Sequence, residues 1–335
     1  MSSPVENMIS DLAERHFIVF AGAGMSKVTG VRGWRELLEA LNGLVALEGV
    51  DIAKIDPLHF PEIAQMIYDR LEKDGRIAAY YETIQEFMKP TQCSWDSKHK
   101  KIIRASSSVV TTNIDGVFEK AMTDILTDRP RGVPSGQEFS YQTLNNLDIK
   151  KTTNPYHITY LHGRYDEKEI ILKTCDYFKF YRIRNGGEAS NLEKALKDVF
   201  CRREGIVFVG FSFEDRFVLE AFEQGFQELK DEMENEKEMR GVCPEDIRHY
   251  VLLEEPVKGG WEQEKCLIEN RAKIKPDSEN WQDACKVEGR EKLERRLREI
   301  NIEVIRYGHD RHVEIEQYFE EIYNRKRGVQ DFLGK

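Results

Sequence analysis

The stretch His16–Ser26, which reads HFIVFAGAGMS, decides the fold class. Its short apolar run predicts a buried strand over Phe17–Phe20, and the small residues that follow predict a tight turn. Glycine allows backbone N–H groups to come close to a phosphate, and a helix N-terminus favours negative charge. One interpretation is an ordinary strand-to-helix turn. The other is a phosphate-binding turn made of Gly22, Ala23, Gly24 and Ser26.

A second informative stretch is Val109–Asp115, which reads VVTTNID. It predicts a strand over Ser108–Thr112 that ends in polar side chains. Ligands of open parallel sheets bind at the carboxyl ends of the strands, so these side chains are candidates for the same pocket. Asn113 can donate and accept hydrogen bonds, but asparagine also commonly ends strands. Asp115 is a candidate site residue or the N-cap of the next helix.

Strands and helices alternate along the rest of the chain, which is typical of a parallel sheet covered on both faces. Further strands are expected over His157–Leu161, Glu169–Leu172, Gly205–Gly210, His249–Leu253 and Ile302–Tyr307. Helices are expected over Trp34–Leu47, Pro61–Leu71, Ile77–Met88, Gly116–Leu126, Asp176–Arg184, Asn191–Arg202, Glu214–Arg240, Trp281–Ile300 and Arg311–Lys326. Loops or connections are expected over Lys89–Lys101, Thr127–Ser140 and Lys258–Asn280. The fold class is therefore α/β, a Rossmann-like doubly wound parallel sheet with a helical insertion.

The domain organisation follows from the same pattern. Residues 1–310 are expected to form one domain, with the insertion around residues 50–100 lying over the site. Residues 311–335 are expected to form a C-terminal helix and tail.

Composition narrows the function classes. The 335 residues carry a net charge of −10, which argues against direct nucleic-acid binding. No apolar run approaches the roughly 20 residues of a membrane helix, and the N-terminus lacks the pattern of a signal peptide, so a cytoplasmic protein is expected. The six cysteines form no C-x-x-C pair, so no metal site is expected.

Four short segments in a fixed order now carry a resemblance. They are GAGMS at Gly22–Ser26, TTNID at Thr111–Asp115, the pair His162-Gly163, and GFSFED at Gly210–Asp215. This set resembles the sirtuin superfamily over roughly residues 12 to 310, and more narrowly the bacterial sirtuin-like NAD hydrolases of antiphage defence.

The resemblance implies that NAD binds as a substrate and assigns roles to single residues. Asn113 is expected to contact the nicotinamide ribose and position water, Asp115 to face the carboxamide, and His162 to act as general base. Without the resemblance, a lone histidine is more often structural. Gly210, Ser212 and Asp215 are expected near the phosphates or the ribose, and Asp215 is also a candidate helix cap.

The sequence departs from deacylating sirtuins because the four-cysteine zinc module that follows their His-Gly strand is missing. An NAD glycohydrolase without a metal is therefore expected. The alternatives are an NAD-dependent deacylase or ADP-ribosyltransferase, and a non-catalytic sensor of NAD or ADP-ribose. The family resemblance further implies a homo-oligomer, or a separate sensor partner such as a DNA-translocating ATPase or an Argonaute-like protein.

Overall fold

A computed structural model gives the fold of most of the chain. The residues that it describes are 3–27, 29–31, 33–90, 97–106, 108–128, 138–148, 151, 154, 156–181, 190–200, 204–213, 215–235, 248–255, 279–308 and 313–332.

The described residues form a sheet of seven strands in the order β3-β4-β2-β1-β5-β6-β7, and all paired strands run parallel. The strands are β1 (Ile18–Ala21), β2 (Ser108–Thr111), β3 (Ser140–Gln142), β4 (His157–Tyr160), β5 (Ile206–Val209), β6 (His249–Glu254) and β7 (Ile302–Tyr307). The first strand lies in the middle, because the chain adds strands on one side as far as β4 and then crosses over to the other. The predicted doubly wound parallel sheet is confirmed.

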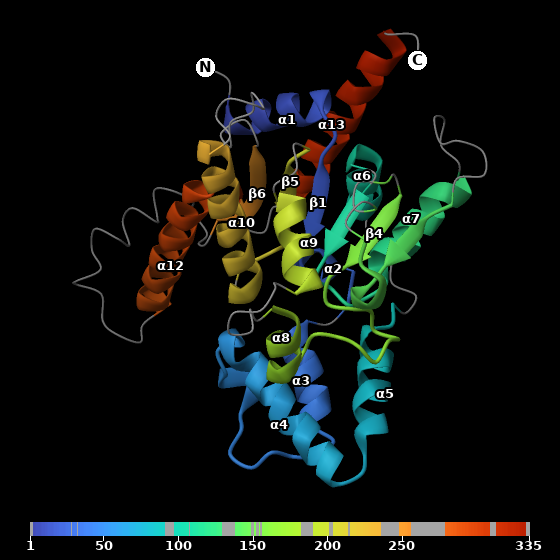
Figure 1. Cartoon of the computed structure of the whole chain (residues 1–335), viewed down its shortest axis with the longest axis vertical. Helices are drawn as coiled ribbons and strands as arrows, with labels where there is room; N and C mark the ends of the chain where they lie inside the picture. The colour runs from blue at the N-terminus through green and yellow to red at the C-terminus, as the bar shows by residue number, and fades with distance from the viewer. Residues whose placement is uncertain are drawn as a thin grey trace.

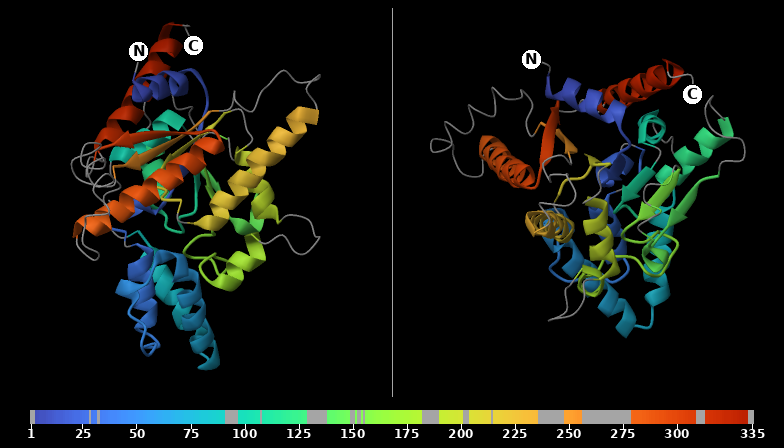
Figure 2. Two further views of the ribbon diagram at one scale, coloured as in Figure 1. Left: turned by 90° about the vertical axis from the view of Figure 1, so that its left-hand side faces the viewer. Right: turned by 45° about the horizontal axis from the view of Figure 1, so that its top comes forward.

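Helices cover both faces of this sheet (Figure 2). Strand side chains alternate between the faces, so Val19 and Ala21 enter one apolar core while Ile18 and Phe20 enter the other. The first core is completed by α1 (Pro4–Glu14), α6 (Ser97–Ser106), α7 (Val117–Asp128) and α13 (Val313–Phe332). The second is completed by α8 (Thr174–Tyr181), α9 (Asn191–Phe200), α10 (Arg216–Asn235) and α12 (Glu279–Glu299).

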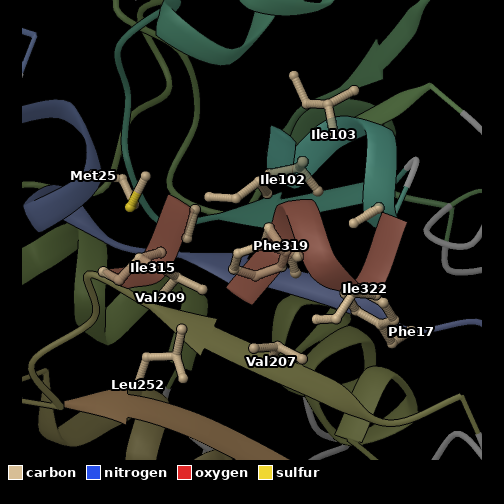
Figure 3. Close-up of a cluster of buried hydrophobic side chains, with 14 of the residues drawn as sticks. Phe17, Met25, Ile102, Ile103, Val207, Val209, Leu252, Ile315, Phe319 and Ile322 are labelled. Atoms are coloured by element: carbon tan, nitrogen blue, oxygen red, sulfur yellow. The ribbon is translucent and has the colours of Figure 1, made fainter. Parts of the chain in front are cut away.

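The C-terminal helix α13 is part of the first core. Phe319 and Ile322 from α13 pack beside Phe17, and the rings of Phe17 and Phe319 are 6.3 Å apart (Figure 3). The helix α1 and the end of α13 lie at the same end of the molecule (Figure 1).

The helical insertion is a separate layer at the opposite end of the molecule (Figure 1). It consists of α3 (Trp34–Asn42), α4 (Phe60–Lys73) and α5 (Ile77–Met88), and has its own apolar core around Leu38, Ile67 and Ile84. The short helix α2 (Ala23–Lys27) follows β1. The insertion lies beyond the carboxyl ends of the central strands, where it closes one side of the site.

Two local expectations were wrong. The segment Glu169–Leu172 is no strand, although Ile170, Ile171 and Leu172 are buried. Ile171 packs into the second sheet core while Ile170 and Leu172 pack into the core of the helical layer, so the segment is apolar because it lies between two cores. The expected loop Lys89–Lys101 is also wrong at its end, because α6 begins at Ser97.

The lysine-rich start of α6 is only partly exposed, because Lys98 and His99 are buried. Lys100 and Lys101 form ion pairs with Asp124 and Glu316, whereas Ile102 and Ile103 point into the core.

The helix α1 and the strand β3 were not predicted, and most of Lys258–Asn280 lies outside the described residues. In the described part of the chain, no helix combines the length and apolar character needed to cross a membrane.

Candidate functional site

A cleft of about 900 Å³ runs along the carboxyl edge of the sheet and reaches the helical layer. Nine of the ten residues predicted for the site line it, and Gly22 is buried beside it without lining it. The nine are Ala23, Gly24, Ser26, Asn113, Asp115, His162, Gly210, Ser212 and Asp215. They come from the ends of β1, β2, β4 and β5, so the sheet order brings all four sequence motifs to one place.

Asn113 is buried just after β2 and holds the turn that follows β1. Its Nδ2 donates to the backbone oxygen of Gly22 at 3.0 Å and to Oγ of Ser26 at 2.9 Å. Its own backbone N–H donates to Oγ1 of Thr111 at 3.0 Å. The amide therefore joins the two central strand ends, and its cleft-facing position is fixed before any ligand arrives.

Asp115 continues this network on the other side of Ser26. Its Oδ1 accepts the backbone N–H of Val117 at 3.0 Å, which caps the start of α7. Burial raises the pKa of Asp115, and a hydrogen bond from Ser26 partly offsets that effect. The carboxyl group is thus both a helix cap and a buried polar group at the wall of the cleft.

The glycines after β1 permit the close contact of two turns. A Cβ on Gly22 would lie 2.4 Å from the backbone oxygen of Gly210, and one on Gly24 would lie 3.0 Å from the same oxygen. The N–H of Gly24 already donates to that oxygen at 2.9 Å, and the N–H of Gly22 donates to Val209 at 3.0 Å. Packing against β5 accounts for both glycines, and phosphate binding by this turn remains a prediction.

His162 lies after β4 within a group of aromatic rings. Its Nε2 is 2.6 Å from the Tyr181 hydroxyl and 3.9 Å from Oδ2 of Asp215. The rings of Tyr177 and Tyr181 stand edge-on to the imidazole, each with its centroid 5.7 Å away. Burial lowers the pKa of His162 to about 3, and nearby Asp176 opposes this shift. The imidazole is therefore neutral at pH 7 and keeps a lone pair.

Asp215 ties the same group to helix α10. Its Oδ1 accepts the backbone N–H groups of Phe217 at 3.1 Å and Val218 at 3.3 Å, so the expected helix cap is present. Its Oδ2 accepts the Tyr177 hydroxyl at 3.1 Å. The sequence did not indicate that the Asp215 carboxylate would lie beside His162. Ser212 lies exposed at the cleft wall.

The tyrosines that surround His162 were not predicted from the sequence. Asp176-Tyr177 is near the His-Gly pair in sequence, but nothing in its pattern indicated that Tyr177 and Tyr181 would contact the imidazole. One turn of α8 separates these two rings, which places both on one face.

The described residues contain no group of three or more histidine, cysteine or acidic side chains arranged to hold a metal ion. Cys175 is exposed on α8.

The fold and site define a class of protein. Residues 107–276, about half of the chain, match the model of the SIR2-like domain, and the chain belongs to this family. The match begins after the turn at Gly22–Ser26, so that motif is additional to it. The resemblance to the sirtuin superfamily is confirmed.

A relative with a defined activity gives a more specific comparison. The NAD(+) hydrolase ThsA of Acinetobacter baumannii (strain 532279) is 27% identical over 215 residues, which are 63% of this chain and 39% of the relative. The chain therefore spans well under half the length of this curated relative.

Proposed function

We propose that this protein hydrolyses NAD to nicotinamide and ADP-ribose. The observation that carries the proposal is that Asn113 and His162, from different strands, meet in one cleft with the turns after β1 and β5. The similarity to an NAD(+) hydrolase supports the same substrate and reaction.

In the proposed reaction, the bond between nicotinamide and the ribose C1′ breaks, and nicotinamide leaves as a neutral molecule. Water supplies the oxygen that bonds to C1′, and one proton is released. His162 accepts that proton, either from the water or through a ribose hydroxyl, because its imidazole is neutral and keeps a lone pair, although burial makes it a weaker base than a free imidazole. The Asp215 carboxylate 3.9 Å away favours the imidazolium that results.

The remaining site residues position the substrate. Asn113 orients the ribose or the attacking water through its side-chain oxygen, since its Nδ2 is engaged with the turn after β1. Asp115 faces the carboxamide. The diphosphate lies along the cleft wall formed by Ala23, Gly24, Ser26, Gly210 and Ser212. Holding the ribose and delivering water are the main requirements, because the leaving group is good.

We further propose that assembly into a homo-oligomer or a sensor partner gates the activity, in a role in antiphage defence. Uncontrolled cleavage would deplete the NAD of the cell. The placement of α8 supports such control. The backbone N–H of Cys175 at its start donates to Gln65 of α4 at 3.1 Å, whereas Tyr181 at its end contacts His162. A displacement of the helical layer would thus reach the imidazole.

The test is to incubate the purified full chain with NAD and follow nicotinamide release, at several protein concentrations and with candidate partners. Wild type is compared with His162→Ala and Asn113→Ala. Release that needs no acylated peptide is expected. Absence of release from the wild type in every assembly state and with every partner would refute the hydrolase, and release only with an acetyl-lysine peptide would establish deacylation instead.

A non-catalytic NAD or ADP-ribose sensor is the second candidate. The observation favouring it is that Nε2 of His162 and Nδ2 of Asn113 already have protein partners. Calorimetry separates the two functions, because a sensor binds NAD with no nicotinamide release.

A further inference from the structure

An arginine from the C-terminal part of the chain lines the cleft. Arg290 comes from α12 and lines the cleft together with Glu254 at the end of β6 and Tyr307 at the end of β7. It is partly buried, and it forms no ion pair or hydrogen bond with any residue that the structure describes. Burial lowers its pKa, although the guanidinium remains charged at neutral pH.

The carboxylate expected to pair with Arg290 is engaged elsewhere. Glu294 lies four residues later on α12, at the spacing of a helical ion pair. Its Oε1 accepts Nε of Arg306 at 2.8 Å, and its Oε2 accepts a guanidinium nitrogen of Arg298 at 3.1 Å. The Glu294 side chain is only 5% exposed. Its charge favours the charged form of Arg290, but both of its oxygens bond to the other two arginines, and Arg290 lines the cleft.

The other charges near Arg290 do not replace that partner. Arg306 repels it, while Glu254 and Tyr307 favour its charge from the ends of β6 and β7. Glu254 has an interaction of its own. Removing a guanidinium partly from water without a paired anion costs free energy. An anion from outside the chain would offset this cost, and a phosphate accepts the two parallel N–H groups of a guanidinium particularly well.

The order of the strands indicates where Arg290 lies relative to the residues of the proposed reaction. Asn113 follows β2, the turn at Gly22–Ser26 follows β1, and Glu254 ends β6. From β2 to β6 there are three strand spacings, about 14 Å at the usual separation of neighbouring strands. A dinucleotide whose nicotinamide lies at Asn113 would cross the turn after β1 and extend its adenosine towards β6.

We propose that Arg290 binds a phosphate group at the adenosine end of the nucleotide. The orientation rests on the proposed function, since it assumes that nicotinamide lies beside Asn113 and His162. The phosphate is either the one on the adenosine 5′ position, which belongs to the diphosphate of NAD, or one on the 2′ position, which distinguishes NADP from NAD.

Calorimetry with small probes tests this without requiring catalysis. The probes are adenosine 5′-monophosphate, adenosine 2′-monophosphate and adenosine, each added to the full chain. Arg290→Met replaces the charged guanidinium side chain with an uncharged, apolar one. Arg296→Met is the matched control, because Arg296 is on the same helix and carries the same charge but pairs with Glu223 of α10 at 2.7 Å.

Arg290→Met is expected to weaken the binding of one monophosphate at least tenfold and to leave the binding of adenosine unchanged. Arg296→Met is expected to bind all three probes with wild-type affinity. Loss for the 5′ compound identifies the diphosphate, and loss for the 2′ compound identifies an NADP-accepting site. Wild-type affinity of Arg290→Met for both monophosphates, an equal loss for adenosine, or no nucleotide binding by the wild type would overturn the proposal. Because only binding is measured, an Arg290-dependent result stands even if nicotinamide release is never found.

Discussion

Replacing Asn113 with alanine removes two hydrogen bonds from the wall of the cleft. The Asn113 amide donates to Gly22 at 3.0 Å and to Ser26 at 2.9 Å. Neither acceptor is left alone, because the Gly22 oxygen also accepts the N–H of Met25 at 3.0 Å and Ser26 also bonds to Asp115. The expected loss is therefore the net value of two ordinary bonds, about 2 kcal/mol in the free energy of unfolding.

Asn113→Asp has nearly the same shape but a different expected outcome. A carboxylate oxygen would face the Gly22 oxygen and would lie in the same network as Asp115. This arrangement raises the pKa of the new carboxyl above its unfolded value. Its penalty is therefore largest when it is ionised, and shrinks as pH falls through the raised folded-state pKa, because protonation restores an O–H donor.

Urea unfolding followed by circular dichroism at pH 7.5 and 5.5 measures both effects. The loss in Asn113→Ala should be the same at the two pH values, and that in Asn113→Asp should be smaller at pH 5.5. Each comparison is made with wild type at the same pH. An alanine variant within about 0.5 kcal/mol of wild type, or an aspartate penalty that does not depend on pH, would refute the argument that the amide holds the turn.

Three further predictions concern buried groups around the sheet edge. In folded His162→Ala, nicotinamide release should fall about 10²–10⁴-fold, and wild-type turnover would assign the base elsewhere. Between pH 7.5 and 5.0 the protein should lose about 2 kcal/mol for each of His162 and His249, because both have a pKa of about 3 when folded and bind protons near pH 6.5 when unfolded. Equal urea midpoints at the two pH values would contradict this. Gly22→Ala should give little folded protein, because its Cβ would meet the Gly210 oxygen at 2.4 Å, and a wild-type unfolding midpoint would show that the turns can separate cheaply.

The sheet could be predicted because its strands carry a strong local signal. Ile18–Ala21 and Ile206–Val209 are buried on both faces, so each reads as a continuous apolar run with glycine at its end. The parallel arrangement then predicted that Asn113 and His162 would approach one another, since parallel strands end at one edge. This part of the site depends only on strand ends and their order.

The environment of His162 could not be predicted in the same way. The tyrosines that contact the imidazole belong to α8, a helix that follows β4 after an irregular segment. Their rings reach His162 only because α8 packs between the helical layer and α10. No periodic pattern in the sequence predicts that packing. The lowered pKa of His162 follows from the burial of its imidazole, so it could not be predicted from the sequence either.

The misassigned segment Glu169–Leu172 explains how these parts are joined. Its apolar residues Ile170, Ile171 and Leu172 predicted a strand, yet they are apolar because they lie between two cores. Immediately after it, Nζ of Lys173 lies 4.5 Å from the ring centroid of Tyr68 on α4 and 2.8 Å from Asp176. The next turn of the chain carries the tyrosines to His162. A sheet strand would have fixed this segment to its neighbours by backbone hydrogen bonds along its length. The observed segment makes one such bond, from the N–H of Ile171 to the backbone oxygen of His162 at 2.9 Å, and the side chain of Lys173 links it to the helical layer and to α8.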